Sequence, residues 1–168
     1  STADSVAAKH ASESDHQKLV SYKNEICDLV AYNDDAAKDD STPYGDPWQL
    51  IYVFDGDSNT NVVCEGYAKA FQYLFDLSKF KSNLMRCTTI SGKMGRDGGT
   101  SEGHMWNIVR MDDGKNYLVD VTNSDTGTVG ANGGLFIAPY ATADTSSNKP
   151  TWYTFTTASN VTEKYTYR

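Results

Sequence analysis

Helical periodicity is confined to the first half of this sequence, and strand-like patterns are confined to the second half. Apolar residues recur at helical spacing from Asp15 to about Val30 and again from Tyr67 to Phe75. From Leu84 onwards, short apolar runs are separated by loops rich in Gly, Ser, Thr and Asn, which is typical of strands. This order predicts an α+β fold with N-terminal helices packed on an antiparallel β-sheet.

The chain is predicted to hold one domain. Residues 1–14 are small and polar and show no apolar periodicity, so they are predicted to form an N-terminal tail or linker. Residues 15–168 have the length of a single domain. Within them, strands are predicted at 84–91, 105–111, 116–122, 135–138 and 152–157, and a mobile glycine-rich loop at 92–103.

Composition and charge exclude several classes of function. The 15 Lys and Arg residues against 22 Asp and Glu give a net charge of -7, so no positive field exists to attract nucleic acid. No apolar stretch approaches the roughly 20 residues that span a bilayer, and no membrane span is expected. The histidines and cysteines never cluster at zinc spacing. The run 55–61 lacks the glycine and the glutamate of a calcium loop, so no metal is expected.

Cys64 is the cysteine best placed for chemistry. A thiol becomes a useful nucleophile at neutral pH when a helix N-terminus and an imidazole stabilise its thiolate form. Cys64 is predicted to open the second apolar helix, whereas Cys27 and Cys87 sit among apolar neighbours and are interpreted as small buried hydrophobic residues. Two of the three histidines lie in or beside the predicted tail, which leaves His104 as the partner of the thiol.

The hairpin around Gly114 decides whether an acidic residue joins this pair. If the turn is a three-residue loop with Gly114 in the left-handed conformation, counting back along both strands sets Trp106 opposite Asp120. Asp120 then shares a face with His104, at about 7 to 8 Å between backbone positions. A two-residue loop would place Asp120 on the other face. A triad of Cys64, His104 and Asp120 therefore requires the three-residue loop.

Each of these three residues also has a structural interpretation. A cysteine in an apolar helix is more often buried packing, a histidine near a tryptophan is often structural, and an aspartate can simply end a strand. Their joint placement, at a helix start and on one face of a hairpin, favours catalysis over these alternatives.

Three blocks of the sequence contain these residues in order: Val63-Cys64-Glu65-Gly66-Tyr67-Ala68-Lys69-Ala70-Phe71, Gly103-His104-Met105-Trp106-Asn107 and Tyr117-Leu118-Val119-Asp120-Val121-Thr122. Together the blocks resemble the bacterial transglutaminase-like superfamily, and the resemblance covers about residues 18–138. It implies a transglutaminase-like (papain-like) fold.

The resemblance also implies a role for each residue. In that family the cysteine attacks a carboxamide or peptide carbonyl, the histidine shuttles the proton and the aspartate orients the histidine. These roles fall on Cys64, His104 and Asp120, and no cofactor is expected. The sequence departs from the family pattern directly after the aspartate, where residues 123–125 replace the usual aromatic residue and acidic turn.

An oxyanion hole needs two hydrogen-bond donors. The backbone amide of Cys64 is the expected first donor, and Gln49 is preferred as the second over its neighbours Trp48 and Tyr52. Trp106 is expected at the rim of the cleft beside His104.

The predicted function is a cysteine-dependent hydrolase or acyl transferase that acts on a protein or peptide substrate through a thioester. Proteolysis or amide hydrolysis is preferred over cross-linking, because the chain lacks the additional domains of the large cross-linking enzymes. The alternative is a non-catalytic binding or structural module. The start at Ser1 suggests a piece of a larger multidomain protein, and the acidic, Tyr-rich composition suggests a secreted or cell-surface bacterial protein.

Overall fold

The computed structural model describes residues 2–36, 60–96, 99–131, 133–139, 141–142, 151–156 and 162–167. The helices are α1 (Thr2–Lys9), α2 (Asp15–Ala36) and α4 (Thr60–Leu77). The strands are β1 (Arg86–Arg96), β2 (Glu102–Arg110), β3 (Asn116–Val119), β4 (Phe136–Pro139), β5 (Ala141–Thr142), β6 (Thr151–Thr156) and β7 (Thr162–Tyr167), and a short 3-10 helix, η1, spans Thr122–Ser124. Helices precede strands, so the α+β class is confirmed.

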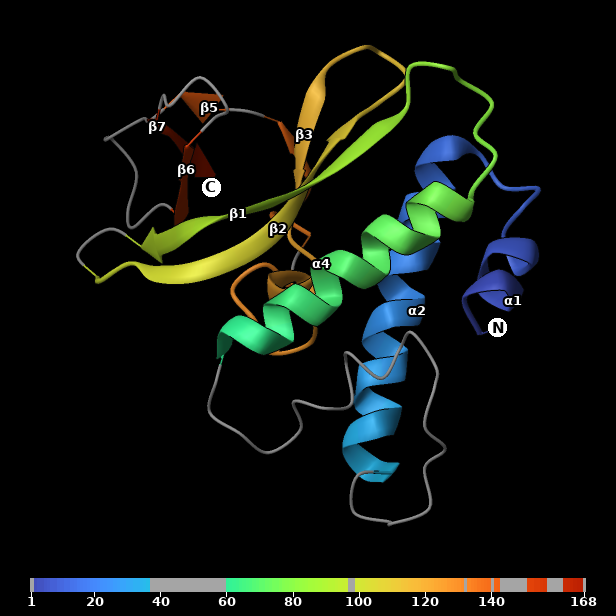
Figure 1. The fold of residues 1–168 in the computed structure, drawn as a ribbon, viewed down its shortest axis with the longest axis horizontal. Helices are drawn as coiled ribbons and strands as arrows, with labels where there is room; N and C mark the ends of the chain where they lie inside the picture. Colours follow the sequence, from blue (N-terminus) through green and yellow to red (C-terminus); the bar gives the residue numbers. More distant parts are fainter. Residues whose placement is uncertain are drawn as a thin grey trace.

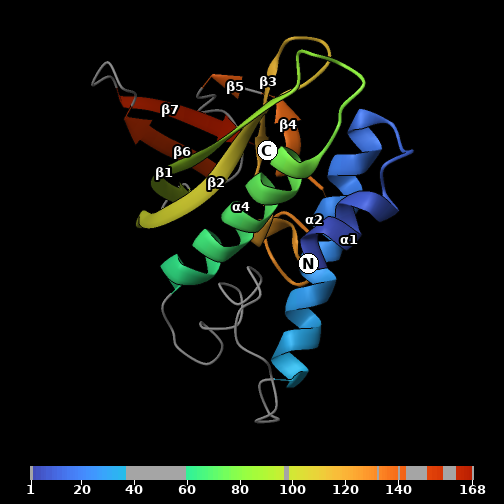
Figure 2. The ribbon, with the colours of Figure 1, turned by 45° about the vertical axis from the view of Figure 1, so that its right-hand side comes forward.

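The described strands form one antiparallel sheet in the order β4-β3-β2-β1-β6-β7-β5. The helices gather on one side of it, and β6 and β7 lie at the end away from them (Figures 1 and 2). Helix α4 packs against β2 and β1, as predicted for the helix that carries Cys64. No helix in these described ranges is long and apolar enough to cross a membrane.

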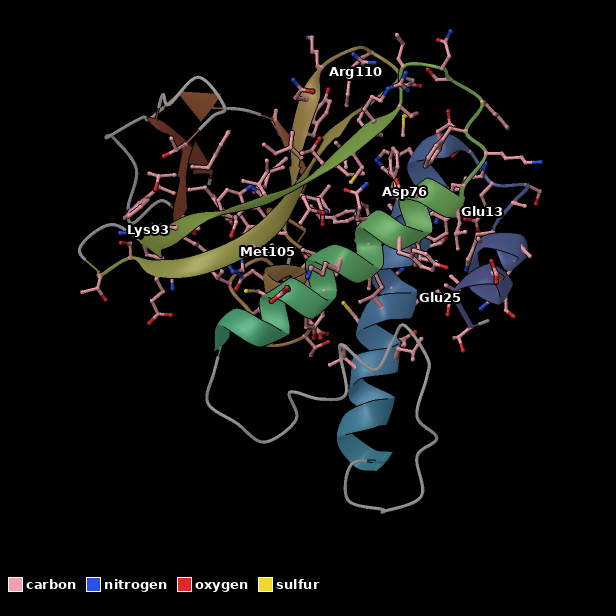
Figure 3. All side chains as sticks on the ribbon, in the orientation of Figure 1. Glu13, Glu25, Asp76, Lys93, Met105 and Arg110 are labelled. Atoms are coloured by element: carbon pink, nitrogen blue, oxygen red, sulfur yellow. The ribbon has the colours of Figure 1, made fainter. Side chains whose placement is uncertain are left out.

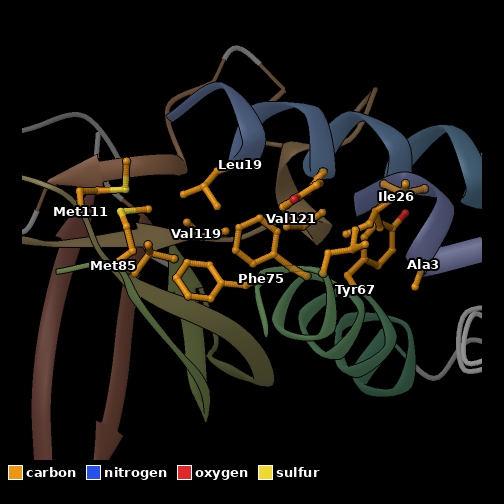
Figure 4. Packing of buried hydrophobic residues seen from close by; sticks show 14 residues of the cluster. Ala3, Leu19, Ile26, Tyr67, Phe75, Met85, Met111, Val119 and Val121 are labelled. Carbon is orange, nitrogen blue, oxygen red and sulfur yellow. The ribbon is translucent and has the colours of Figure 1, made fainter. Parts of the chain in front are cut away.

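The main core lies between the helices and the sheet. Helix α2 contributes Leu19, α4 contributes Phe75 and β3 contributes Val119, and the three belong to one buried cluster (Figure 4). This packing explains the helical spacing of apolar residues in both long helices, because each helix buries one stripe in this cluster. A second cluster, which includes Trp106 and Tyr153, belongs to the part of the sheet that supports the candidate site.

The prediction that residues 1–14 form a tail is wrong. Helix α1 occupies Thr2–Lys9, and its Ala3 and Val6 are buried in the main core. The His10 ring, which follows α1, then contacts residues before and within α2: its Nδ1 lies 2.8 Å from Glu13 Oε1 and its Nε2 2.9 Å from Glu25 Oε1. Glu13 and Glu25 are labelled beside α1 and α2 in Figure 3. Two small apolar residues one helical turn apart are too weak a signal to stand out in sequence, yet they suffice when other helices cover them.

The β2–β3 hairpin has the three-residue loop that the triad requires. Met111 N donates to Lys115 O at 3.0 Å, and Gly114 adopts a φ of 75°. Arg110 pairs with Asn116, which is the register predicted from the loop. Strand β3 ends at Val119, so Asp120 lies just beyond the ladder and leads into η1.

The glycine-rich segment is largely strand, which corrects the prediction of a mobile loop over 92–103. Strand β1 runs on to Arg96 because Gly92 and Gly95 allow neighbours to approach closely. A Cβ at Gly92 would lie 2.2 Å from the Thr154 carbonyl oxygen, and a Cβ at Gly95 would lie 2.4 Å from the Trp152 ring. These glycines serve packing between β1 and β6.

Other boundaries also shift. Helix α2 continues to Ala36, beyond the predicted end near Val30, and α4 begins at Thr60 instead of Cys64. The added stretches mix polar and apolar residues, and helix ends are the boundaries that sequence patterns mark least precisely.

We expect Gly92→Ala to destabilise the fold by about 1 to 3 kcal/mol, because the new methyl group meets backbone that cannot move alone. Ser91→Ala is the matched control, since Ser91 is an exposed neighbour in the same strand. Urea unfolding measures both variants. Equal stabilities of the two would show that β6 does not approach Gly92 this closely.

Candidate active site

His104 lies between an aspartate and a cysteine. Its Nε2 atom is 2.8 Å from Asp120 Oδ2, and the imidazole also has the Cys64 side chain as a hydrogen-bond partner. The imidazole comes from the start of β2, the carboxylate from the residue after β3, and the sulfur from the N-terminal part of α4. The structure thus brings together the three residues that the sequence singled out.

The Asp120 carboxylate is completely buried, with 0% exposure. Besides His104, its Oδ2 atom accepts hydrogen bonds from Tyr153 Oη at 2.6 Å and from Asn123 Nδ2 at 2.9 Å. The Asp120 amide donates to Leu135 O at 3.0 Å, which anchors the backbone to the chain just before β4. Such a set of donors offsets the cost of removing a carboxylate from water.

Aromatic residues fix the plane of the imidazole. The His104 ring is stacked on Trp106, with centroids 5.9 Å apart and an interplanar angle of 21°. Trp106 is only 2% exposed, so it supports the imidazole from within the protein and is not the rim residue that was predicted. Residues 104 and 106 share a face because alternate residues of a strand point the same way.

The electrostatics favour a charged imidazole. Burial alone would lower the pKa of His104, but hydrogen bonds to Asp120 and Cys64, together with their attraction for the charge, raise it to about 9. An imidazolium at neutral pH is the form that can pair with a thiolate and later donate a proton.

Cys64 is the fifth residue of α4 and is 1% exposed. The first four N–H groups of a helix have no acceptor within the helix, and the N–H of Cys64 falls just after them. This corrects the prediction that Cys64 opens the helix and that its amide is a free oxyanion donor. The helix dipole also weakens beyond the first turn, which leaves His104 as the main partner of the thiol.

The other two thiols are unsuited to nucleophilic chemistry. Burial, aided by the nearby Asp125 carboxylate, raises the pKa of Cys27 to about 12, and burial likewise raises the pKa of Cys87. Both are free cysteines. Their interpretation as packing residues agrees with this, and Cys64 differs from both in having an imidazole partner.

A cavity of about 420 Å³ opens beside the imidazole. Its lining includes His104 and Asn123, with the charged residues Arg96 and Glu102. The lining comes from β1, β2 and the segment that follows Asp120, so the hairpin and η1 together shape it.

Several predicted site residues cannot be placed. Gln49, Trp48 and Tyr52 lie outside the described residues, as does most of the run 55–61, whose last two residues begin α4. Tyr153 was missed by sequence reasoning because it follows Asp120 at long range and is one of 11 tyrosines. Asn123 carried a local signal, since an aspartate often accepts a hydrogen bond from the backbone N–H three residues later.

Comparison of the sequence with known proteins identifies no family: no protein-family model and no curated protein matches the chain. Among the side chains that the structure describes, no group of three or more His, Cys, Asp or Glu could hold a metal ion.

Proposed function

We propose that this protein is a cysteine-dependent hydrolase or acyl transferase that acts on peptide or carboxamide bonds. The observation that carries the proposal is His104, which is hydrogen-bonded to a buried carboxylate on one side and to the Cys64 side chain on the other. A nucleophile, a base that contacts it and a third group that orients the base form the usual arrangement for acyl transfer. The resemblance of the three sequence blocks to the transglutaminase-like superfamily supports the same chemistry.

In the proposed reaction, the Cys64 thiolate attacks the carbonyl carbon, a C–S bond forms and the carbonyl π electrons move to the oxygen. The tetrahedral intermediate then collapses and its C–N bond breaks, while the His104 imidazolium gives its proton to the leaving nitrogen. Water or an amine next attacks the thioester and passes a proton to His104. Cleavage of the C–S bond returns the thiolate and the imidazolium.

The cavity beside His104 suits the two proton transfers of this reaction. The leaving nitrogen and the incoming water or amine must both come within hydrogen-bond distance of the imidazole. His104 lines the cavity, which gives both groups a route to it. Proteolysis or amide hydrolysis is our first choice. A panel of peptides, incubated with and without an added amine, separates the two reactions: hydrolysis releases a carboxylic acid, whereas transamidation gives a new amide.

The second candidate function is a non-catalytic binding or structural module. The burial of Cys64, at 1% exposure, favours it, because a nucleophile must meet its substrate. Reactivity of the thiol distinguishes the two candidates.

We expect iodoacetamide to alkylate Cys64 rapidly at about pH 6, and His104→Ala to slow the reaction roughly 10- to 100-fold. A free cysteine is only about 0.3% thiolate at that pH, so rapid alkylation needs a partner such as the His104 imidazolium, which the variant removes. Mass spectrometry of the peptides reports each thiol separately, and Cys27 and Cys87 are internal controls because their pKa values are raised.

His16→Ala is the matched control variant, since His16 is an exposed histidine on α2. It should leave the alkylation rate unchanged. A wild-type rate at Cys64 similar to that of free cysteine would exclude the enzymatic proposal and leave the binding module.

A further inference from the structure

Three donors converge on one oxygen atom of Asp120. Oδ2 lies 2.6 Å from Tyr153 Oη, 2.8 Å from His104 Nε2 and 2.9 Å from Asn123 Nδ2. The other oxygen, Oδ1, accepts from the Asn123 backbone N–H at 3.3 Å. A carboxylate oxygen has about two lone-pair sites, so three donors on Oδ2 share its charge. The His104 imidazolium therefore receives only part of the negative charge on that oxygen.

Tyr153 is held firmly in this position. It lies in β6, where it pairs with Met94 of β1 and with Tyr165 of β7. Its side chain is 1% exposed, and its ring packs edge-on against Trp106 with centroids 5.0 Å apart. The Trp106 indole also supports the His104 ring, so Tyr153 and His104 are both held against the same side chain while they contact Asp120.

Asn123 approaches the carboxylate from the other direction. It contacts both oxygens of Asp120, through its backbone N–H and its side chain, and its Nδ2 also donates to Met94 Sδ at 3.2 Å. The same nitrogen lies 3.3 Å from His104 Nε2. Asn123 belongs to the segment where the sequence departs from the transglutaminase-like pattern, so this contact is a feature of this chain.

We propose that Tyr153 and Asn123 are positioning residues of the site: they donate to the same Asp120 oxygen as His104, fix the carboxylate, and limit how strongly it holds the His104 proton. The catalytic meaning of this role rests on the proposed function. A general acid must release its proton as well as bind it, and a carboxylate whose charge is shared among three donors makes that release easier. The hydroxyl of Tyr153 makes the shortest of the three contacts, at 2.6 Å.

The ionisable groups that surround His104 come from four elements and from the residue after β3: Cys64 from α4, Arg96 from β1, Glu102 from β2, Tyr153 from β6, and Asp120. Tyr153→Phe keeps the ring and every charge in this list, and it removes only the shared hydroxyl. Any change in the titration of His104 then reports the hydrogen bond.

The test follows the His104 ring proton by NMR across pH, with the signal assigned by its loss in His104→Gln. We expect Tyr153→Phe to move the titration midpoint upward by roughly 0.5 to 1 unit, because the remaining charge of Asp120 falls more fully on the imidazolium. Asn123→Ala should move it in the same direction. An unchanged or lowered midpoint in Tyr153→Phe would overturn the proposal, since a purely structural tyrosine would affect stability without raising the midpoint.

Tyr117→Phe is the matched control. The Tyr117 hydroxyl also donates to an aspartate, Asp113, but in the exposed turn of the β2–β3 hairpin. Removal of the Tyr117 hydroxyl should leave the titration midpoint of His104 unchanged. A shift in Tyr117→Phe as large as that in Tyr153→Phe would contradict an effect that acts through the hydrogen bond to Asp120. The NMR titration needs no reactive thiol, so it can succeed where the alkylation of Cys64 fails, and the two proposals fall separately.

Discussion

Asp120→Asn is expected to reduce the proposed acyl-transfer activity on the order of 10⁴-fold, the loss typical when a buried aspartate that orients a catalytic histidine becomes an amide. Among the groups that raise the pKa of His104, the Asp120 carboxylate has the largest effect. Its hydrogen bond to His104 Nε2 is 2.8 Å long. An amide of the same shape keeps the packing but removes the charge and offers a donor where three donors already converge.

The measurement is turnover of any substrate that the wild-type protein cleaves in the peptide panel, together with NMR titration of His104. The pKa of His104 should fall from about 9 towards its ordinary value of 6.5, because burial then acts with less opposition. The pH above which activity declines should fall with it. Activity within tenfold of wild type would show that Asp120 does not orient the histidine.

Asp113→Asn is the matched control for this variant. Asp113 also accepts a tyrosine hydroxyl, from Tyr117, and a backbone N–H, from Lys115 at 2.8 Å, but it is exposed in the hairpin turn. It should retain full activity. Thermal unfolding of both variants separates loss of the fold from loss of the site.

The stability of the protein is expected to fall by roughly 3 kcal/mol between about pH 6.5 and pH 9 because of His104 alone. The pKa of this group is raised in the folded state to about 9 from its ordinary 6.5. A raised pKa means that the folded state binds the proton more tightly than the unfolded state does. The stabilisation is therefore complete below about pH 6.5 and is lost as the pH rises through about 9.

Urea unfolding of the wild type and of His104→Gln at a series of pH values measures this contribution as a difference. His10 also has a raised pKa, because hydrogen bonds to Glu25 and Glu13 outweigh its burial, and it contributes in the same direction. Its effect is common to both proteins and cancels. Parallel stability curves for the two proteins across this range would show that His104 is not charged in the fold.

The order of elements and the position of one hairpin turn could be predicted from local signals. Apolar residues at helical spacing place α2 and α4 because each helix buries one stripe. Gly114 marks the β2–β3 turn because a left-handed backbone strongly favours glycine, but a two-residue and a three-residue loop both place it there, and the loop length sets which residues face each other. The structure has the three-residue loop, which puts Asp120 on the face of His104.

Other features depended on contacts that no local signal reports. The glycines at 92 and 95 indicate a loop by sequence, but in the fold they allow β6 to pack closely against β1. Helix α1 lies in a stretch of small and polar residues that shows no apolar periodicity. Trp106 was expected at a rim, but the sheet encloses it. Each error arose because burial depends on what covers a residue, and that cover comes from distant parts of the chain.

By itself, the sequence determined the α+β class and the position of the hairpin turn, and it singled out Cys64, His104 and Asp120, which the structure brings together. Tertiary structure alone decided what surrounds them. The third donor to Asp120 comes from Tyr153, which reaches the site only because β6 pairs with β1. Periodicity and turn geometry act over a few residues. How strongly a buried carboxylate accepts a hydrogen bond, and how it is oriented, depend on every donor that the whole fold places around it.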